Sequence, residues 1–130
     1  MTGLRILVVD DESLIAMALN DQLEYLGHEV VATASSGQEA IALAEQHRPD
    51  LVLMDVYLGG GIDGLEAAEQ INVARSTPII ILTGFPDKTL IERGRDRGVV
   101  AHLVKPIDLD DLRLAVEAGW RRSQEPPGPD

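Results

Sequence analysis

The sequence contains no cysteine, which excludes disulfide bonds and thiolate metal ligands. Aromatic residues make up only 3% of its 130 residues, so Val, Ile, Leu and Ala must fill the core. No apolar run approaches the ~18 residues that a membrane-spanning helix needs. Basic residues are outnumbered by acidic ones, 11 to 22, and the net charge of −11 disfavours nucleic acid or an anionic membrane as a direct partner.

The length and composition are those of one globular domain, with 45% hydrophobic residues. We expect this domain to cover residues 1–123, and the proline-rich residues 124–130 to form a disordered tail. The first strand is expected almost at the N-terminus, which leaves no room for a signal peptide. We therefore expect a soluble, cytoplasmic protein.

Strand-like and helix-like segments alternate five times along the chain. The strand-like apolar segments span residues 4–9, 30–34, 51–54, 79–82 and 99–104. This alternation, with short connections, predicts a doubly wound α/β domain with a five-stranded parallel sheet and helices on both faces. Two helices should begin at capping boxes, Ser36–Glu39 and Asp63–Glu66. The helical segment 87–97 has little apolar surface, so we expect it to be among the less stable parts.

Polar residues stand where several of these strands should end. The run Leu51–Met54 suits a strand that is buried on both faces, and Asp55 follows it. An aspartate after a single strand is more often a turn or helix-cap residue. Ligands of open α/β sheets, however, bind beyond the carboxyl ends of the strands. A functional site is favoured because polar residues also follow three other strands, namely Asp10, Asp11, Thr83 and Lys105.

The same strand ends carry five motifs in a fixed order: VVDDE at 8–12, LVLMD at 51–55, DG at 63–64, LTG at 82–84 and VKPI at 104–107. With these motifs the sequence resembles response-regulator receiver domains, the CheY-like phosphoacceptors of two-component signalling, from about Arg5 to Arg121. The resemblance implies a flavodoxin-like sheet with strand order 2-1-3-4-5. It also implies a cis peptide bond at Lys105-Pro106, where the proline makes that isomer accessible.

The resemblance implies a magnesium site next to a phosphoacceptor. Asp55 matches the aspartate that is phosphorylated, a carboxylate nucleophile that forms an acyl phosphate. Asp10 and Asp11 match the acidic pair that holds Mg²⁺ together with Asp55, and the backbone carbonyl of Tyr57 would add an oxygen ligand. Carboxylate and phosphate oxygens are the ligands that Mg²⁺ prefers, and the cation would relieve the repulsion among the carboxylates.

Two further residues complete the set that the resemblance implies. Lys105 matches the lysine that pairs with phosphoryl oxygens, and only one other lysine, Lys88, occurs in the chain. This scarcity suggests that a compact ammonium is needed at that position. Thr83 matches the hydroxyl that turns toward the phosphoryl group on activation. Gly84 would leave room for the phosphodonor.

Two features depart from the family pattern. The loop VYLGGGIDG after Asp55 is one residue longer than usual, so we expect a more mobile loop around an intact metal site. His102 stands where the family usually has a Tyr or Phe whose rotamer reports phosphorylation. His102 is therefore either a switch residue with Thr83 or a half-buried packing residue.

Other notable side chains have more than one interpretation. His28 and His47 are expected to face solvent. Arg93, Arg95 and Arg97 form either a solvated helix face or a partner or dimer contact beside His102. On the last helix, Trp120 shares an apolar face with Leu109, Leu112 and Val116. We therefore expect Trp120 to lie in the core or an interface.

These features predict a single-domain response regulator. It would take a phosphoryl group from a histidine kinase or a His-phosphotransfer protein onto Asp55. It would then signal by protein–protein contact through the fourth helix, fifth strand and fifth helix, or act as a phosphate sink. We expect no enzymatic activity beyond its own phosphorylation and dephosphorylation, no nucleic-acid or membrane partner, and a monomer or phosphorylation-linked dimer.

Two other functions fit the sequence less well. A phosphohydrolase of the haloacid-dehalogenase type also uses an aspartyl nucleophile and Mg²⁺, but it needs Asp-x-Asp after the first strand and a substrate cap. This chain has Asp10-Asp11-Glu12 there and no length for a cap. A pseudo-receiver that never meets phosphate is opposed by the intact aspartate, threonine and lysine set.

Overall fold

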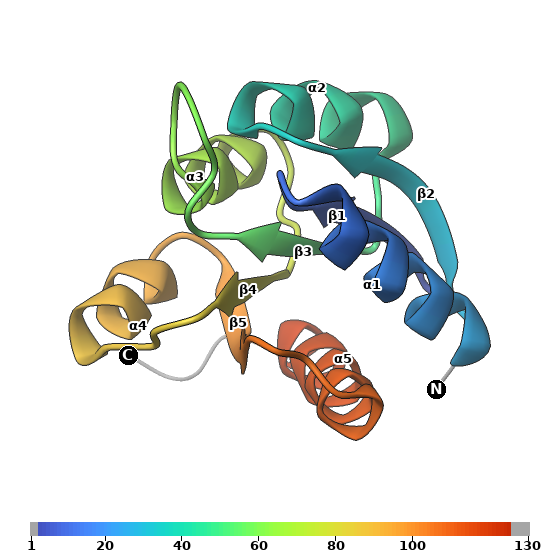
Figure 1. Cartoon of the computed structure of the whole chain (residues 1–130). Helices are drawn as coiled ribbons and strands as arrows, with labels where there is room; N and C mark the ends of the chain where they lie inside the picture. Colours follow the sequence, from blue (N-terminus) through green and yellow to red (C-terminus); the bar gives the residue numbers. More distant parts are fainter. Residues whose placement is uncertain (1–2, 126–130) are drawn as a thin grey trace.

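The computed structural model describes residues 3–125, in which five strands alternate with five helices (Figure 1). The strands are β1 (Arg5–Val9), β2 (Glu29–Ala34), β3 (Leu51–Asp55), β4 (Ile79–Thr83) and β5 (Val99–Val104). The helices are α1 (Ser13–Tyr25), α2 (Gly37–His47), α3 (Gly64–Ala74), α4 (Lys88–Arg95) and α5 (Leu109–Ser123). Most of the tail that was expected to be disordered, residues 126–130, lies outside the described residues.

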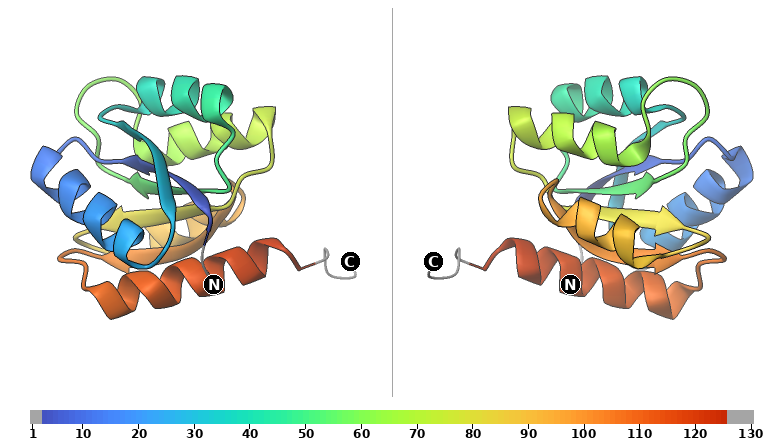
Figure 2. Two further views of the ribbon diagram at one scale, coloured as in Figure 1. Left: turned by 90° about the vertical axis from the view of Figure 1, so that its right-hand side faces the viewer. Right: turned by 90° about the vertical axis from the view of Figure 1, so that its left-hand side faces the viewer.

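All neighbouring strands pair in parallel, in the order β2-β1-β3-β4-β5, which confirms the predicted fold class and strand order. Helices cover both faces of this sheet (Figure 2). Alternate strand residues point to opposite faces, so the core forms two clusters. One cluster joins the sheet to α2, α3 and α4, and the other joins it to α1 and α5, where Trp120 is half-buried as expected.

Burial is greatest in the middle of the sheet and lower at the β5 edge. Every residue of β3 and β4 is buried. On β5, in contrast, Leu103 is buried while His102 and Val104 are exposed. His102 is therefore not the half-buried packing residue that was considered as an alternative, and a role in switching remains a prediction.

One of the two expected capping boxes is complete. The Asp63 carboxylate accepts a hydrogen bond from the Glu66 N–H at 2.9 Å, and the Glu66 carboxylate accepts one from the Asp63 N–H at 3.4 Å. At α2, Ser36 Oγ accepts from the Glu39 N–H as predicted, but the Glu39 carboxylate accepts from the Ser35 N–H at 2.7 Å. The predicted return bond from the Ser36 N–H to the Glu39 side chain was therefore wrong, because the donor is the preceding residue, Ser35.

The expectation that His28 faces solvent was wrong. Its side chain is only 6% exposed, and its Nδ1 accepts a hydrogen bond from the Leu4 N–H at 3.2 Å. Burial lowers the pKa of His28, which favours the neutral ring that can accept this bond. His47, at the end of α2, is partly exposed.

Helix α4 buries only Leu90 and Gly94, in agreement with its sparse apolar sequence. Its arginines are not simply a solvated face. Arg93 and Arg97 reach back to α3, where they pair with Asp63 at 3.8 Å and with Glu69 at 3.4 Å. Arg95, between them, is exposed. Arg93 on α4 and Arg97, two residues after the end of α4, therefore connect this part of the chain to α3 and its N-cap residue.

Within residues 3–125, no helix has both the length and the apolar character that crossing a bilayer requires.

Candidate functional site

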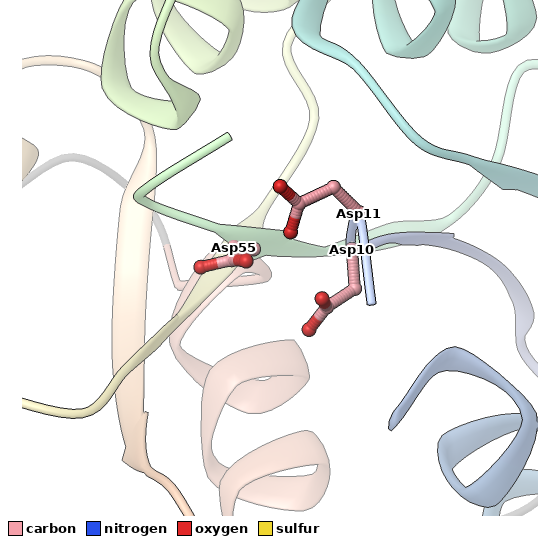
Figure 3. Close-up of side chains that lie close together, drawn as sticks. All are labelled: Asp10, Asp11 and Asp55. Atoms are coloured by element: carbon pink, nitrogen blue, oxygen red, sulfur yellow. The ribbon is translucent and has the colours of Figure 1, made fainter. Parts of the chain in front are cut away.

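Three aspartate side chains meet at the carboxyl edge of the sheet (Figure 3). Asp10 and Asp11 directly follow β1, and Asp55 is the last residue of the neighbouring strand β3. Each contributes a carboxylate oxygen to a cluster in which these atoms lie within 4.8 Å of one another. Asp10 and Asp55 are buried and Asp11 is exposed, so the cluster has an open side.

Backbone N–H groups hold all three carboxylates in place. Each carboxylate accepts one such bond through one of its two oxygens. The bonds run from Glu12 to Asp10 Oδ1 at 2.9 Å, from Gly59 to Asp11 Oδ2 at 3.2 Å, and from Tyr57 to Asp55 Oδ1 at 3.2 Å.

Lys105, directly after β5, places its positively charged ammonium group in this cluster. Its Nζ lies 3.1 Å from Asp10 Oδ2 and 3.3 Å from Asp55 Oδ2. Glu12 Oε1 is 3.8 Å from the same Nζ. Glu12 was not among the predicted site residues; its place after the acidic pair was the only signal for it. The predicted cis peptide bond at Lys105-Pro106 is present.

The crowding of like charges changes the ionisation of the site. Burial, and then the neighbouring Asp10 carboxylate, raise the pKa of Asp55 to about 6, although Lys105 and the Tyr57 N–H oppose this shift. For Lys105, burial lowers the pKa, but Asp10 and Asp55 outweigh it and the pKa stands above its usual value. At neutral pH, Asp55 is therefore mostly ionised and Lys105 carries its charge.

Thr83 ends β4 next to β3 and is completely buried. Its Oγ1 accepts a hydrogen bond from the Phe85 N–H at 3.0 Å. A Cβ added at Gly84 would meet no atom within 4 Å, so the space beside the site is open there, as expected for the approach of a donor.

His102, the other predicted switch residue, is not part of the cluster. It pairs with Ile81 in the sheet and lines a small cleft of about 220 Å³ with Arg95 and Arg122. Among residues 3–125 it has no side-chain hydrogen bond or ion pair to Thr83 or to the three aspartates.

The longer loop after Asp55 packs against the start of α2. A Cβ on Gly37 would lie 2.6 Å from Ile62 Cγ1, and one on Gly61 would lie 2.6 Å from the Gln38 side chain. Ile62 also packs against the core cluster under α2 and α3. The expectation of a loosely held loop therefore finds no support in its contacts, although its mobility is untested.

The donor set fits a hard divalent cation. Three carboxylates provide oxygen ligands, and among the described residues the buried Asp10 Oδ2 has only the Lys105 ammonium beside it, at 3.1 Å. A ligand role for the backbone carbonyl of Tyr57, two residues after Asp55, remains a prediction. Oxygen ligands of this kind are those that Mg²⁺ prefers.

The chain is similar to several known proteins. Residues 6–117 match the family model of the response regulator receiver domain. The chain is 46% identical over 121 residues to the transcriptional regulatory protein PdtaR of Mycobacterium tuberculosis, covering 93% of this chain and 58% of that protein. It is 32% identical over 118 residues to sporulation initiation phosphotransferase F of Bacillus subtilis, covering 90% of this chain and 94% of that protein.

A similar fold occurs in the crystal structure of the signal receiver domain of a modulated diguanylate cyclase from Desulfovibrio desulfuricans G20. The TM-score is 0.85 at 32% identity, with 94% of this chain and 97% of that chain covered. A putative response regulator from Chloroflexus aurantiacus gives 0.82 at 30% identity, with 93% and 100% covered. The chain spans less than two thirds of the length of PdtaR.

Proposed function

The chain belongs to the response regulator receiver family of two-component signalling, and from that premise we propose that Asp55 accepts a phosphoryl group from a histidine kinase or a His-phosphotransfer protein. The observation that carries this proposal is that the buried Asp55 carboxylate lies beside the Lys105 ammonium group and two further carboxylates. Asp55 Oδ2 is 3.3 Å from Lys105 Nζ, and carboxylate oxygens of Asp10, Asp11 and Asp55 lie within 4.8 Å of one another.

The chain's own groups can position the transfer. The Tyr57 N–H holds Asp55 Oδ1, which leaves Oδ2 on the side of Lys105 and free to attack phosphorus. The new O–P bond makes an acyl phosphate as the P–N bond to the donor histidine breaks. The Lys105 ammonium can then move from Asp10 and Asp55 to the phosphoryl oxygens. Mg²⁺ held by Asp10, Asp11, Asp55 and the Tyr57 carbonyl would neutralise charge on these oxygens.

We infer that Thr83 transmits the change to the face formed by α4, β5 and α5. Its hydroxyl lies at the end of the strand beside β3, and the sparse apolar contacts of α4 leave that helix able to move. A downstream protein would read this face. The alternative output, a phosphate sink, needs only the transfer itself.

Intact mass after incubation with Mg²⁺ and acetyl phosphate tests the phosphoacceptor. Wild type should gain one phosphoryl group and Asp55→Asn none, while Asp11→Asn should need more Mg²⁺ for the same uptake. Asp21→Asn, at an exposed position on α1, is the matched control and should behave as wild type. A phosphorylated Asp55→Asn protein would rule out Asp55 as the acceptor.

A further inference from the structure

A groove of about 460 Å³ runs between α2 and α3, which lie side by side (Figure 2). The lining residues recur along about two turns of each helix, so the hollow follows the helices and is not a closed pocket. Its lining residues are Ile41, Ala44, Glu45 and Arg48 on α2 and its cap, Gln70, Ile71, Ala74 and Arg75 on α3 and its cap, and Thr77.

Two arginines at one end of this groove belong to a basic group of three. Arg75 Nη1 donates a hydrogen bond to the Pro49 carbonyl at 2.9 Å, and Arg5 Nη1 donates one to the Arg48 carbonyl at 3.1 Å. The carbonyls of the consecutive residues 48 and 49 thus each bind one guanidinium group. The third guanidinium belongs to Arg48 itself.

None of these three arginines pairs with a carboxylate within 4.0 Å in the part of the chain that the structure describes. This is unexpected in a chain with 22 acidic and 11 basic residues. Glu45 is the one acidic residue that lines the groove, and it too makes no ion pair there. Gathering like charges costs energy that an anionic partner would offset.

The floor of the groove is apolar. Ala44 and Ile71 are buried, and Ile41 packs partly against the core. A groove flanked by two helices, with an apolar floor and guanidinium groups at one end, suits a peptide that inserts an aliphatic side chain and presents carboxylates to the arginines. We propose that the α2–α3 groove docks an acidic segment of a partner protein.

This docking surface is separate from the phosphoacceptor. Arg48 and Arg75 precede β3 and β4, so they lie at the amino edge of the sheet, whereas Asp55 lies at the carboxyl edge. A segment in the groove would leave the face around Asp55 open to a phosphodonor. The partner could therefore stay bound in both phosphorylation states, which suits an anchoring contact.

Selection from a displayed library of random dodecapeptides against the whole chain tests the proposal without a known partner. Counterselection uses the Arg48→Gln/Arg75→Gln double variant. We expect recovered peptides in which Asp or Glu flanks Leu or Ile. A synthetic copy of one should shift the amide resonances of residues 41–48 and 70–77.

The matched variants separate charge recognition from folding. The double variant should bind the peptide about tenfold or more weakly, as the loss of charge-assisted hydrogen bonds implies. Arg121→Gln, an exposed arginine far along α5, should bind as wild type. Thermal unfolding checks that the double variant folds. Its phosphoryl uptake at Asp55 should equal that of wild type. Peptide binding and phosphoryl uptake are measured separately, so a failure of the phosphoacceptor proposal would be distinguished from a failure of the docking proposal.

Several outcomes would overturn the proposal. Recovery of no peptide, recovery of peptides without acidic residues, resonance shifts outside the groove, or equal binding to the double variant would each do so. If octanoate shifts the groove resonances and no peptide does, the groove binds a small anion and the partner segment is refuted.

Discussion

A Cβ built on Gly64 would lie 2.1 Å from the carbonyl oxygen of Asp55, closer than real Cβ atoms come to any neighbour. The first residue of α3 thus rests directly on the backbone of Asp55, the proposed phosphoacceptor, and the Gly64 N–H donates to the Val56 carbonyl at 2.9 Å. In the Asp63-Gly64 pair, the aspartate caps the helix and the glycine permits this approach.

Gly64→Ala should therefore disturb both the fold and the site. We expect the free energy of unfolding to fall by about 2 kcal/mol or more, since the backbone must move to admit the methyl group. Phosphoryl uptake at Asp55 should slow as well. Urea unfolding and intact mass measure the two effects. Gly84→Ala is the control, because its methyl group would meet nothing within 4 Å and should leave stability unchanged. Equal stability of the two variants would contradict the close contact.

Asp55→Asn should be more stable than wild type at pH 7.5 without Mg²⁺. The pKa of Asp55 is about 6 in the folded protein against 3.8 ordinarily, so folding disfavours the ionised form. The difference should be about 1–3 kcal/mol, and it should shrink as the pH falls through 6 towards 4. Urea unfolding at several pH values checks this. Mg²⁺ should stabilise wild type more than the variant, and an advantage that grows in acid would refute the assignment.

Lys105→Gln should destabilise the protein when Mg²⁺ is absent. Its ammonium bridges Asp10 and Asp55, and its loss leaves two buried carboxylates to repel each other. We expect a loss of about 1–3 kcal/mol, partly recovered by Mg²⁺. Lys88→Gln removes the chain's other lysine from an exposed pair with Glu92 and should cost less than about 0.5 kcal/mol. Thermal unfolding with and without Mg²⁺ gives the comparison, and equal losses in the two variants would be the contrary result.

His28 should make the fold sensitive to acid. Burial lowers its folded pKa below 6.5, and Glu117 opposes this only in part. The stabilisation from the neutral ring is then present above pH 6.5 and is lost as the pH falls below it. An Asp55→Asn background removes the opposite effect of that carboxylate. Between pH 7.5 and 5, the free energy of unfolding of the Asp55→Asn protein should fall more steeply than that of the Asp55→Asn/His28→Gln double variant. The Asp55→Asn/His47→Gln double variant should keep the steep pH dependence. The same pH dependence in all three proteins would exclude His28 as the source of the acid sensitivity.

The strand ends could be predicted because their cause is general. Parallel strands place their carboxyl ends at one edge, so Asp10, Asp55, Thr83 and Lys105 had to meet there once the alternation of elements was recognised. The low apolar content of α4 likewise predicted its few buried residues, since burial of a helix depends on its apolar face.

Other features depend on contacts that no local pattern encodes. His28 sits at a helix–strand turn, a setting that usually faces solvent, yet it is buried and accepts a hydrogen bond from Leu4, which directly precedes β1 and lies 24 positions away in the sequence. The approach of Glu12 to Lys105 depends on how the chain turns into α1. Arg5 and Arg75 donate hydrogen bonds to the carbonyls of consecutive residues although 70 positions separate the two arginines in the sequence.

The complete burial of β3 also has a kinetic meaning. Its backbone amides, paired on both sides with β1 and β4, should exchange their hydrogens with solvent only through global unfolding. The β5 edge, with His102 and Val104 exposed, should exchange through smaller and faster openings. The acyl phosphate would thus form on the slowest-opening strand, and phosphorylation would change the opening rates two strands away, at the loosely packed β5 edge.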